Sequence, residues 1–78
     1  DPTVARNLAV AYNNRAVANL ALAKNQAALD DTNAAIKLRP DYAAAYRARA
    51  AVHQKMGNIA AARADLAKAE SLQAGGTR

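Results

Sequence analysis

The side chains able to do chemistry are few, and their spacing does not build a catalytic or metal site. His53 is the only histidine, and the chain has no cysteine. A zinc ion needs several such ligands at set spacings, and one histidine with scattered carboxylates does not supply them. Asp30 and Asp31 are adjacent, so on a helix they point to different sides and do not form an acid–base pair. We therefore predict no enzyme, no metal and no cofactor, with His53 as a packing residue and both aspartates in solvent.

Basic side chains outnumber acidic ones. Lys and Arg number 11 against 6 Asp and Glu, for a formal net charge of +5. No acid lies between Asp41 and Asp65, a stretch that holds Arg47, Arg49 and Lys55. Such residues most often form a solvated face, but a guanidinium can also bind a carboxylate through two parallel bonds. Surfaces that bind nucleic acid interleave basic with aromatic side chains. That pattern is missing here, so the sequence favours an acidic protein or peptide partner over nucleic acid.

Composition predicts a single all-α domain. The chain has 78 residues and is rich in alanine, the best helix former. A β-sandwich would need β-branched and aromatic residues, which are scarce. No uncharged apolar stretch is long enough to cross a bilayer, so we predict no membrane partner. The absence of cysteine leaves the cytoplasm and the periplasm both open as compartments.

Apolar spacing and helix-breaking residues predict four helices joined by short connections. The expected helices cover about 3–23, 25–38, 41–55 and 58–73, in a domain 1–74 followed by a flexible tail, 75–78. Pro40 ends the second helix because the residue before a proline is pushed out of the α region. Gly57 is a typical C-terminal stop. The residues expected to begin the helices are Thr3 or Pro2, Asn25, Asp41 and Asn58.

The chain repeats itself after 34 residues. This shift aligns alanines throughout, together with four matches of other residue types that keep a single register. Those four pairs are Tyr12 with Tyr46, Arg15 with Arg49, Asp31 with Asp65 and Leu38 with Leu72. Two copies of one helical hairpin therefore make up almost the whole chain.

This period and pattern resemble the tetratricopeptide-repeat family, most closely at the junction of segments 35–40 and 41–46. The resemblance implies two stacked antiparallel helix-turn-helix repeats, a short α-solenoid. It also implies small residues wherever helices touch, here Ala16, Ala28, Ala35, Ala50, Ala62 and Ala69. The chain departs from the family pattern at several large positions. Arg15 and Arg49 replace a leucine, Asn19 and His53 a tyrosine, and Thr32 an aromatic residue, and we expect these changes to weaken apolar packing.

The resemblance further implies a concave groove lined by the first helix of each repeat. The residues predicted to contact a peptide or a partner helix there are Val10, Asn13, Asn14, Val17, Leu20, Arg47, Gln54 and Lys55. Helical spacing independently puts the first four on one face. The asparagines could hydrogen-bond a peptide backbone, and Arg47 could pair with a carboxylate.

The predicted function is a protein–protein interaction scaffold. The alternative is a structural segment of a longer solenoid or a self-associating module, possible as a homo-oligomer because the last helix shows no evident polar cap over Ile59, Leu66 and Leu72. The residues that some family members use to clamp a C-terminal carboxylate fall here on Ala44 and Ala48. We therefore do not predict binding of chaperone tails.

Overall fold

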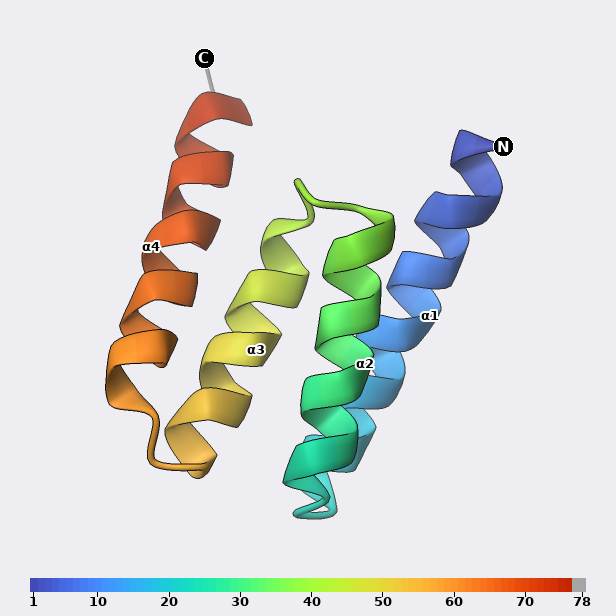
Figure 1. The fold of residues 1–78 in the computed structure, drawn as a ribbon. Helices are drawn as coiled ribbons and strands as arrows, with labels where there is room; N and C mark the ends of the chain where they lie inside the picture. Colours follow the sequence, from blue (N-terminus) through green and yellow to red (C-terminus); the bar gives the residue numbers. More distant parts are fainter. Residues whose placement is uncertain (77–78) are drawn as a thin grey trace.

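The computed structural model describes residues 1–76, which form four helices and no strand (Figure 1). The helices are α1 (Pro2–Ala21), α2 (Asn25–Leu38), α3 (Ala43–Lys55) and α4 (Ile59–Gly76). The all-α class predicted from the sequence is confirmed. The expected boundaries differ by a residue or two, except that α4 runs on to Gly76. Residues 75 and 76 are therefore helical rather than part of a tail, and 77–78 lie outside the described residues.

The helices pair as two antiparallel hairpins laid side by side (Figure 1). In the described residues α1 packs on α2 and α3 packs on α4, while α2 and α1 both contact α3. α4 contacts α3 alone. None of the described helices combines the length and apolar character that crossing a membrane requires.

Alanine fills the contacts between the helices. Ala9, Ala35 and Ala45 form a fully buried cluster that joins three helices. All six alanines expected at helix contacts are buried. Small side chains let the helix backbones approach closely, but each removes little apolar surface from water. The resulting core is thin, and Tyr12, Ile36 and Tyr42 only partly cover it.

The helix N-termini differ from the sequence prediction. α1 is capped by Asp1, whose carboxylate accepts a hydrogen bond from the backbone N–H of Thr3 at 3.0 Å, and Pro2 occupies the first helical position. The predicted caps Asn25 and Asp41 are wrong. Asn25 already lies inside α2, and α3 begins two residues after Asp41, with Tyr42 at the cap position. Neither helix has a side-chain cap.

Both hairpins turn through the same backbone motif. The N–H of Lys24 donates to the carbonyl of Asn19 at 2.8 Å, and the N–H of Asn58 donates to that of His53 at 2.8 Å. This arrangement closes a helix and requires a residue in the left-handed region. The residues there are Gly57, with φ of 82°, and Ala23, with φ of 60°. Only glycine adopts this conformation at no steric cost.

We expect the two turns to respond in opposite ways to exchange of alanine and glycine. Ala23→Gly should raise the free energy of unfolding by about 0.5–1 kcal/mol, because it removes left-handed strain. Gly57→Ala should lower it by about 1 kcal/mol, although no atom lies within 4 Å of the added Cβ. Urea denaturation of the two variants tests both signs. Destabilisation by Ala23→Gly would contradict the strain at that turn.

Candidate functional site

A bidentate ion pair joins the two helices of the first hairpin. Arg15 on α1 donates from Nε to Asp31 Oδ2 at 3.0 Å and from Nη2 to Oδ1 at 2.7 Å. Asn19, one turn further along α1, donates to the same Oδ2 at 2.9 Å. Asp31 is buried, so both carboxylate oxygens need these donors.

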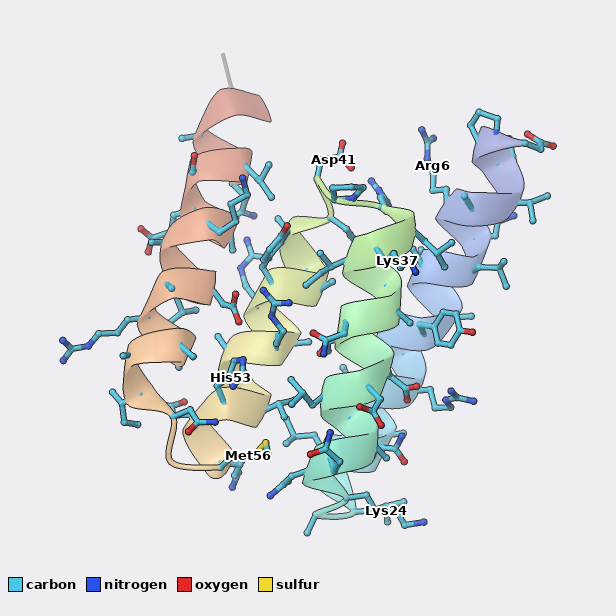
Figure 2. All side chains as sticks on the ribbon, in the orientation of Figure 1. Arg6, Lys24, Lys37, Asp41, His53 and Met56 are labelled. Carbon is cyan, nitrogen blue, oxygen red and sulfur yellow. The ribbon has the colours of Figure 1, made fainter. Side chains whose placement is uncertain are left out.

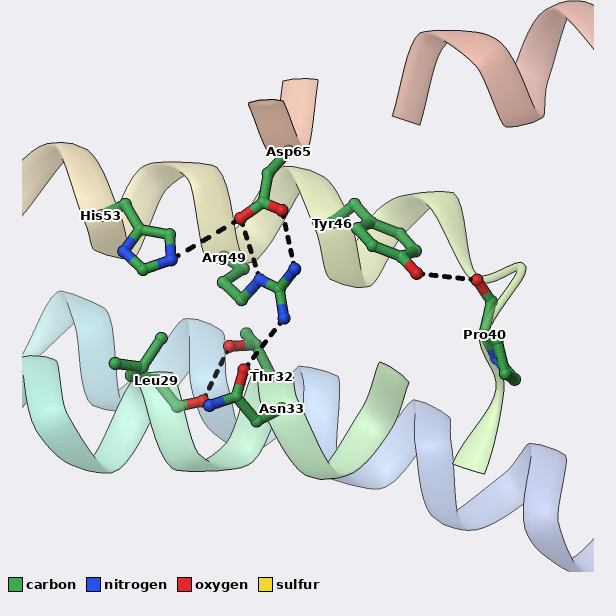
Figure 3. Close-up of polar contacts among 8 residues, drawn as sticks. All are labelled: Leu29, Thr32, Asn33, Pro40, Tyr46, Arg49, His53 and Asp65. Atoms are coloured by element: carbon green, nitrogen blue, oxygen red, sulfur yellow. Dashed lines mark hydrogen bonds and ion pairs between the residues drawn. The ribbon is translucent and has the colours of Figure 1, made fainter. Parts of the chain in front are cut away.

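The second hairpin repeats this pair (Figure 3). Arg49 on α3 donates from Nε to Asp65 Oδ2 at 2.9 Å and from Nη2 to Oδ1 at 2.8 Å. His53 stands at the position of Asn19, with Nε2 3.7 Å from Asp65 Oδ2. Arg49 also donates from Nη1 to Asn33 Oδ1 on α2 at 3.0 Å. A single arginine therefore connects three helices and ties one hairpin to the other.

Each arginine also lies over a tyrosine one turn before it. The Arg15 guanidinium carbon is 5.4 Å from the ring centre of Tyr12, and that of Arg49 is 5.5 Å from Tyr46. The Tyr46 hydroxyl donates to the carbonyl of Pro40 at 2.9 Å, which holds the ring against the loop between the hairpins (Figure 3). A cation over an aromatic face adds a modest attraction.

Several sequence-based interpretations of these residues are wrong. Asp31 is buried and paired rather than solvated, and Arg49 is committed to Asp65 and Asn33. The arginines at the leucine positions do not simply weaken packing, because they supply the polar bridge of each hairpin. Thr32, at an aromatic position, is fully buried and donates to the Leu29 carbonyl at 2.9 Å.

His53 is a half-buried packing residue, as predicted, with its side chain 17% exposed. Its Nδ1 is buried and has no hydrogen-bond partner among the described residues. Nor do the described residues contain any group of three or more His, Cys, Asp or Glu side chains that could hold a metal ion. The sequence signal for the true role of the aspartates was available, since an Arg and an Asp recur at the same separation in both repeats.

The ion pairs hold their charges firmly. Hydrogen bonding from Arg15 lowers the pKa of Asp31, and the same bond raises the pKa of Arg15. The hydrogen bond to Asp65 likewise raises the pKa of Arg49. These groups therefore stay ionised at neutral pH, and each charge is paired within its own hairpin.

The residues predicted to line a concave groove fall into three classes of exposure. Five are exposed, namely Asn14, Val17, Arg47, Gln54 and Lys55. Val10 and Leu20 are half-buried. Asn13 is buried, and its Oδ1 has no partner among the described residues. Of the asparagine pair, only Asn14 therefore presents its side chain to solvent.

The fold brings the two helices that carry these residues together, because α1 and α3 are in contact. Val17 on α1 is 54% exposed. Arg47 on α3 forms no ion pair with any described residue, unlike Arg15 and Arg49. An unpaired cation is thus exposed on α3, and an exposed apolar side chain lies on the neighbouring helix α1.

Two hollows lie where no site was predicted from the sequence. One of about 260 Å³ lies along α1 and is lined by Leu8, Ala11, Tyr12 and Arg15. The other, of about 220 Å³, lies at the end of the bundle where Figure 2 labels Arg6 and Asp41, and Arg39 is also in its lining. Arg39 already has partners there. Its guanidinium carbon is 4.5 Å from the ring centre of Tyr42, and its Nε is 3.7 Å from Asp41 Oδ1.

Comparison with known proteins assigns no family to the chain. No protein-family model matches it, and neither a curated protein nor a solved structure does. Function must therefore be argued from the residues and their arrangement alone.

We expect the two ion pairs to differ in strength. Asp65→Asn should lower the free energy of unfolding by about 2 kcal/mol, because Arg49 loses half of a bidentate bond in a partly buried setting. Asp31→Asn should cost less, since the Arg15 side chain is 65% exposed against 24% for Arg49. Chemical denaturation of the two variants measures the order, and an equal or reversed order would contradict it.

The Asp31 pair should also make folding sensitive to acid. Because the native pKa of Asp31 lies below its ordinary value of 3.8, the unfolded chain binds the proton more readily. Its contribution to stability is complete above that value and is lost as pH falls toward the lower native pKa. The free energy of unfolding is measured by chemical denaturation at a series of pH values below neutral. It should fall more steeply with decreasing pH in Asp30→Asn, which changes the exposed neighbour and keeps Asp31, than in Asp31→Asn. Equal slopes would show that Asp31 is not responsible.

Proposed function

We propose that this chain is a protein–protein interaction module of the tetratricopeptide type, which binds an acidic peptide along the face shared by α1 and α3. The observation that carries the proposal is the unpaired Arg47, exposed on α3 beside a helix with exposed apolar surface. A guanidinium with no internal partner is free to take a carboxylate from outside through two parallel hydrogen bonds.

The remaining contacts of such a peptide come from α1. Val17 offers an apolar surface, and the Asn14 amide can both donate to and accept from an extended backbone. Half-buried Val10 and Leu20 border them. Apolar contact supplies affinity, while the amide and the guanidinium fix orientation.

The family resemblance supports a binding role over catalysis. The buried alanines occupy the small-residue positions of the repeat, and the reactive side chains are held in structural pairs. Stacked helical repeats present extended surfaces to partners, and the exposed residues Asn14 and Val17 on α1 and Arg47 on α3 belong to such a surface.

Arg47→Glu provides the test, with Arg63→Glu as its matched control because Arg63 is exposed on α4. Fluorescent peptides with acidic side chains are titrated into the chain with either a free or an amidated C-terminus. We expect Arg47→Glu to weaken the best peptide about tenfold or more, since it removes a charged hydrogen bond and adds repulsion. The control should stay close to the wild type.

Both variants change the net charge equally, so general attraction to a basic protein would weaken equally in both. Equal losses would therefore contradict a site at Arg47. Comparison of the free and amidated peptides then separates recognition of a terminal carboxylate from recognition of an acidic side chain.

A further inference from the structure

One side of α1 carries a continuous stripe of exposed residues. Spacings of four and three residues alternate along it, and its members are Val4, Leu8, Ala11, Arg15, Ala18 and Leu22, all exposed. We call this set the α1 stripe. Alternate spacing of four and three is the pattern by which one helix packs along another. The stripe alone does not show what would cover it, but the corresponding positions in the second hairpin show which kind of element packs there.

Two of the corresponding positions on α3 are buried. Ala11 and Ala18 are exposed, whereas their counterparts Ala45 and Val52 are 0% and 1% exposed. The element next to that side of α3 is α2 (Figure 1). Ala45 clusters with Ala35 of α2 and Ala9 of α1, and Arg49 on the same side bonds Asn33 of α2, so α2 lies on this side. The α1 stripe is therefore the open copy of a helix-docking face whose occupied form is visible in the same molecule.

α2 shows what kind of helix fits this face. It presents Leu29, Asn33 and Ile36, again at spacings of four and three. Leu29 and Ile36 are half-buried, and Ile36 packs against the buried alanine cluster. Asn33 supplies the amide oxygen that accepts from Arg49 Nη1 at 3.0 Å. The occupant thus combines two aliphatic side chains with a central amide.

Arg15 on the α1 stripe is set up as Arg49 is. Its Nε and Nη2 are fixed on Asp31 as those of Arg49 are on Asp65. Arg49 uses its remaining nitrogen, Nη1, to donate to Asn33. The only acceptors bonded to Arg15 among the described residues are those of Asp31. The hollow of about 260 Å³ beside it is the space that an aliphatic side chain would enter.

We propose that the α1 stripe is a docking site for an amphipathic helix of a partner protein, one that carries an aliphatic residue, an amide four residues later and a second aliphatic residue three further on. The amide accepts from Arg15, and one aliphatic side chain fills the hollow between Leu8 and Ala11. This site lies on a different side of α1 from Val17 and stands independently of the peptide face.

A second copy of this chain does not fit the α1 stripe. Its α2 is already covered by α3, and the matching positions on α4 are Arg63, Ala67 and Glu70, all exposed. These supply charges where aliphatic side chains are needed and no amide for Arg15. α4 still leaves Ile59 and Leu66 exposed, which agrees with the expectation that no polar cap covers them. Two α1 stripes facing each other would bring like-charged guanidinium groups together.

The test uses a peptide of residues 24–39, which contains α2. A side-chain cross-link between positions 27 and 31, on the side opposite to Asn33, keeps this short segment helical. It is titrated to about 1 mM into the isotope-labelled chain, and backbone and Arg Nε–H shifts are followed by NMR. A second cross-linked peptide carries Asn33→Ala and Ile36→Glu, the residues found on α4.

We expect saturable shifts confined to the α1 stripe and to Arg15 Nε–H, and at least tenfold weaker binding of the second peptide. Ala11→Arg in the chain should abolish the shifts, whereas Ala64→Arg, exposed on α4, should leave them unchanged. Arg47→Glu should also leave them unchanged, which separates this site from the peptide face. No shifts at the highest peptide concentration, or shifts centred on α3, would overturn the proposal.

Sedimentation of the chain alone decides the identity of the occupant. A mass that stays monomeric over the NMR concentration range supports a partner helix. A dimer that Ala11→Arg returns to monomer would assign the stripe to a second copy and would overturn the proposal.

Discussion

The structure depends on one interaction used twice, the bidentate bond between an arginine on the first helix of each hairpin and an aspartate on the second. A core built of alanine buries little apolar area, so hydrophobic contact alone specifies helix rotation only weakly. The guanidinium–carboxylate pair is directional, because two parallel hydrogen bonds form in one relative orientation only. Buried Asp31 and Asp65 would lose both partners if either hairpin slid by a turn. The ion pairs thus supply the specificity that small side chains cannot.

This arrangement also decides which surface remains for partners. Arg15 and Arg49 are committed internally, and Asn33 extends the second pair across to the first hairpin. The cations without an ion pair on α3 among the described residues are Arg47 and Lys55, and the apolar surface left uncovered on α1 lies at Val17 and along the α1 stripe. The two proposed binding surfaces therefore adjoin the internal network, and Arg15 is the member of that network that also lies on the α1 stripe.

Sequence reasoning found the helices and their contacts because those depend on local signals. Pro40 and Gly57 mark helix ends by backbone sterics, and the 34-residue period placed the small residues at the interfaces. It left the role of Asp31 unassigned, although the 34-residue register aligns Asp31, and not Asp30, with Asp65 and so marks the aspartate that faces Arg15. The predicted caps of α2 and α3 were wrong, because Asn25 lies inside α2 and α3 begins two residues after Asp41. Burial of Asn13 is likewise a property of the assembled hairpins.

The two outer helices, α1 and α4, present different kinds of surface. In the repeat register, the aliphatic and amide residues with which α2 meets α3 become arginine, alanine and glutamate on α4. The α1 stripe resembles the side of α3 that packs on α2, because Asp31 orients Arg15 as Asp65 orients Arg49. In the proposed docking a partner helix is received on α1, whereas α4 exposes Arg63 and Glu70 together with Ile59 and Leu66. The hollow beside Leu8 and the Arg15 guanidinium both lie on the α1 stripe. A partner helix that supplies the contacts α2 makes with α3 would therefore gain binding free energy there.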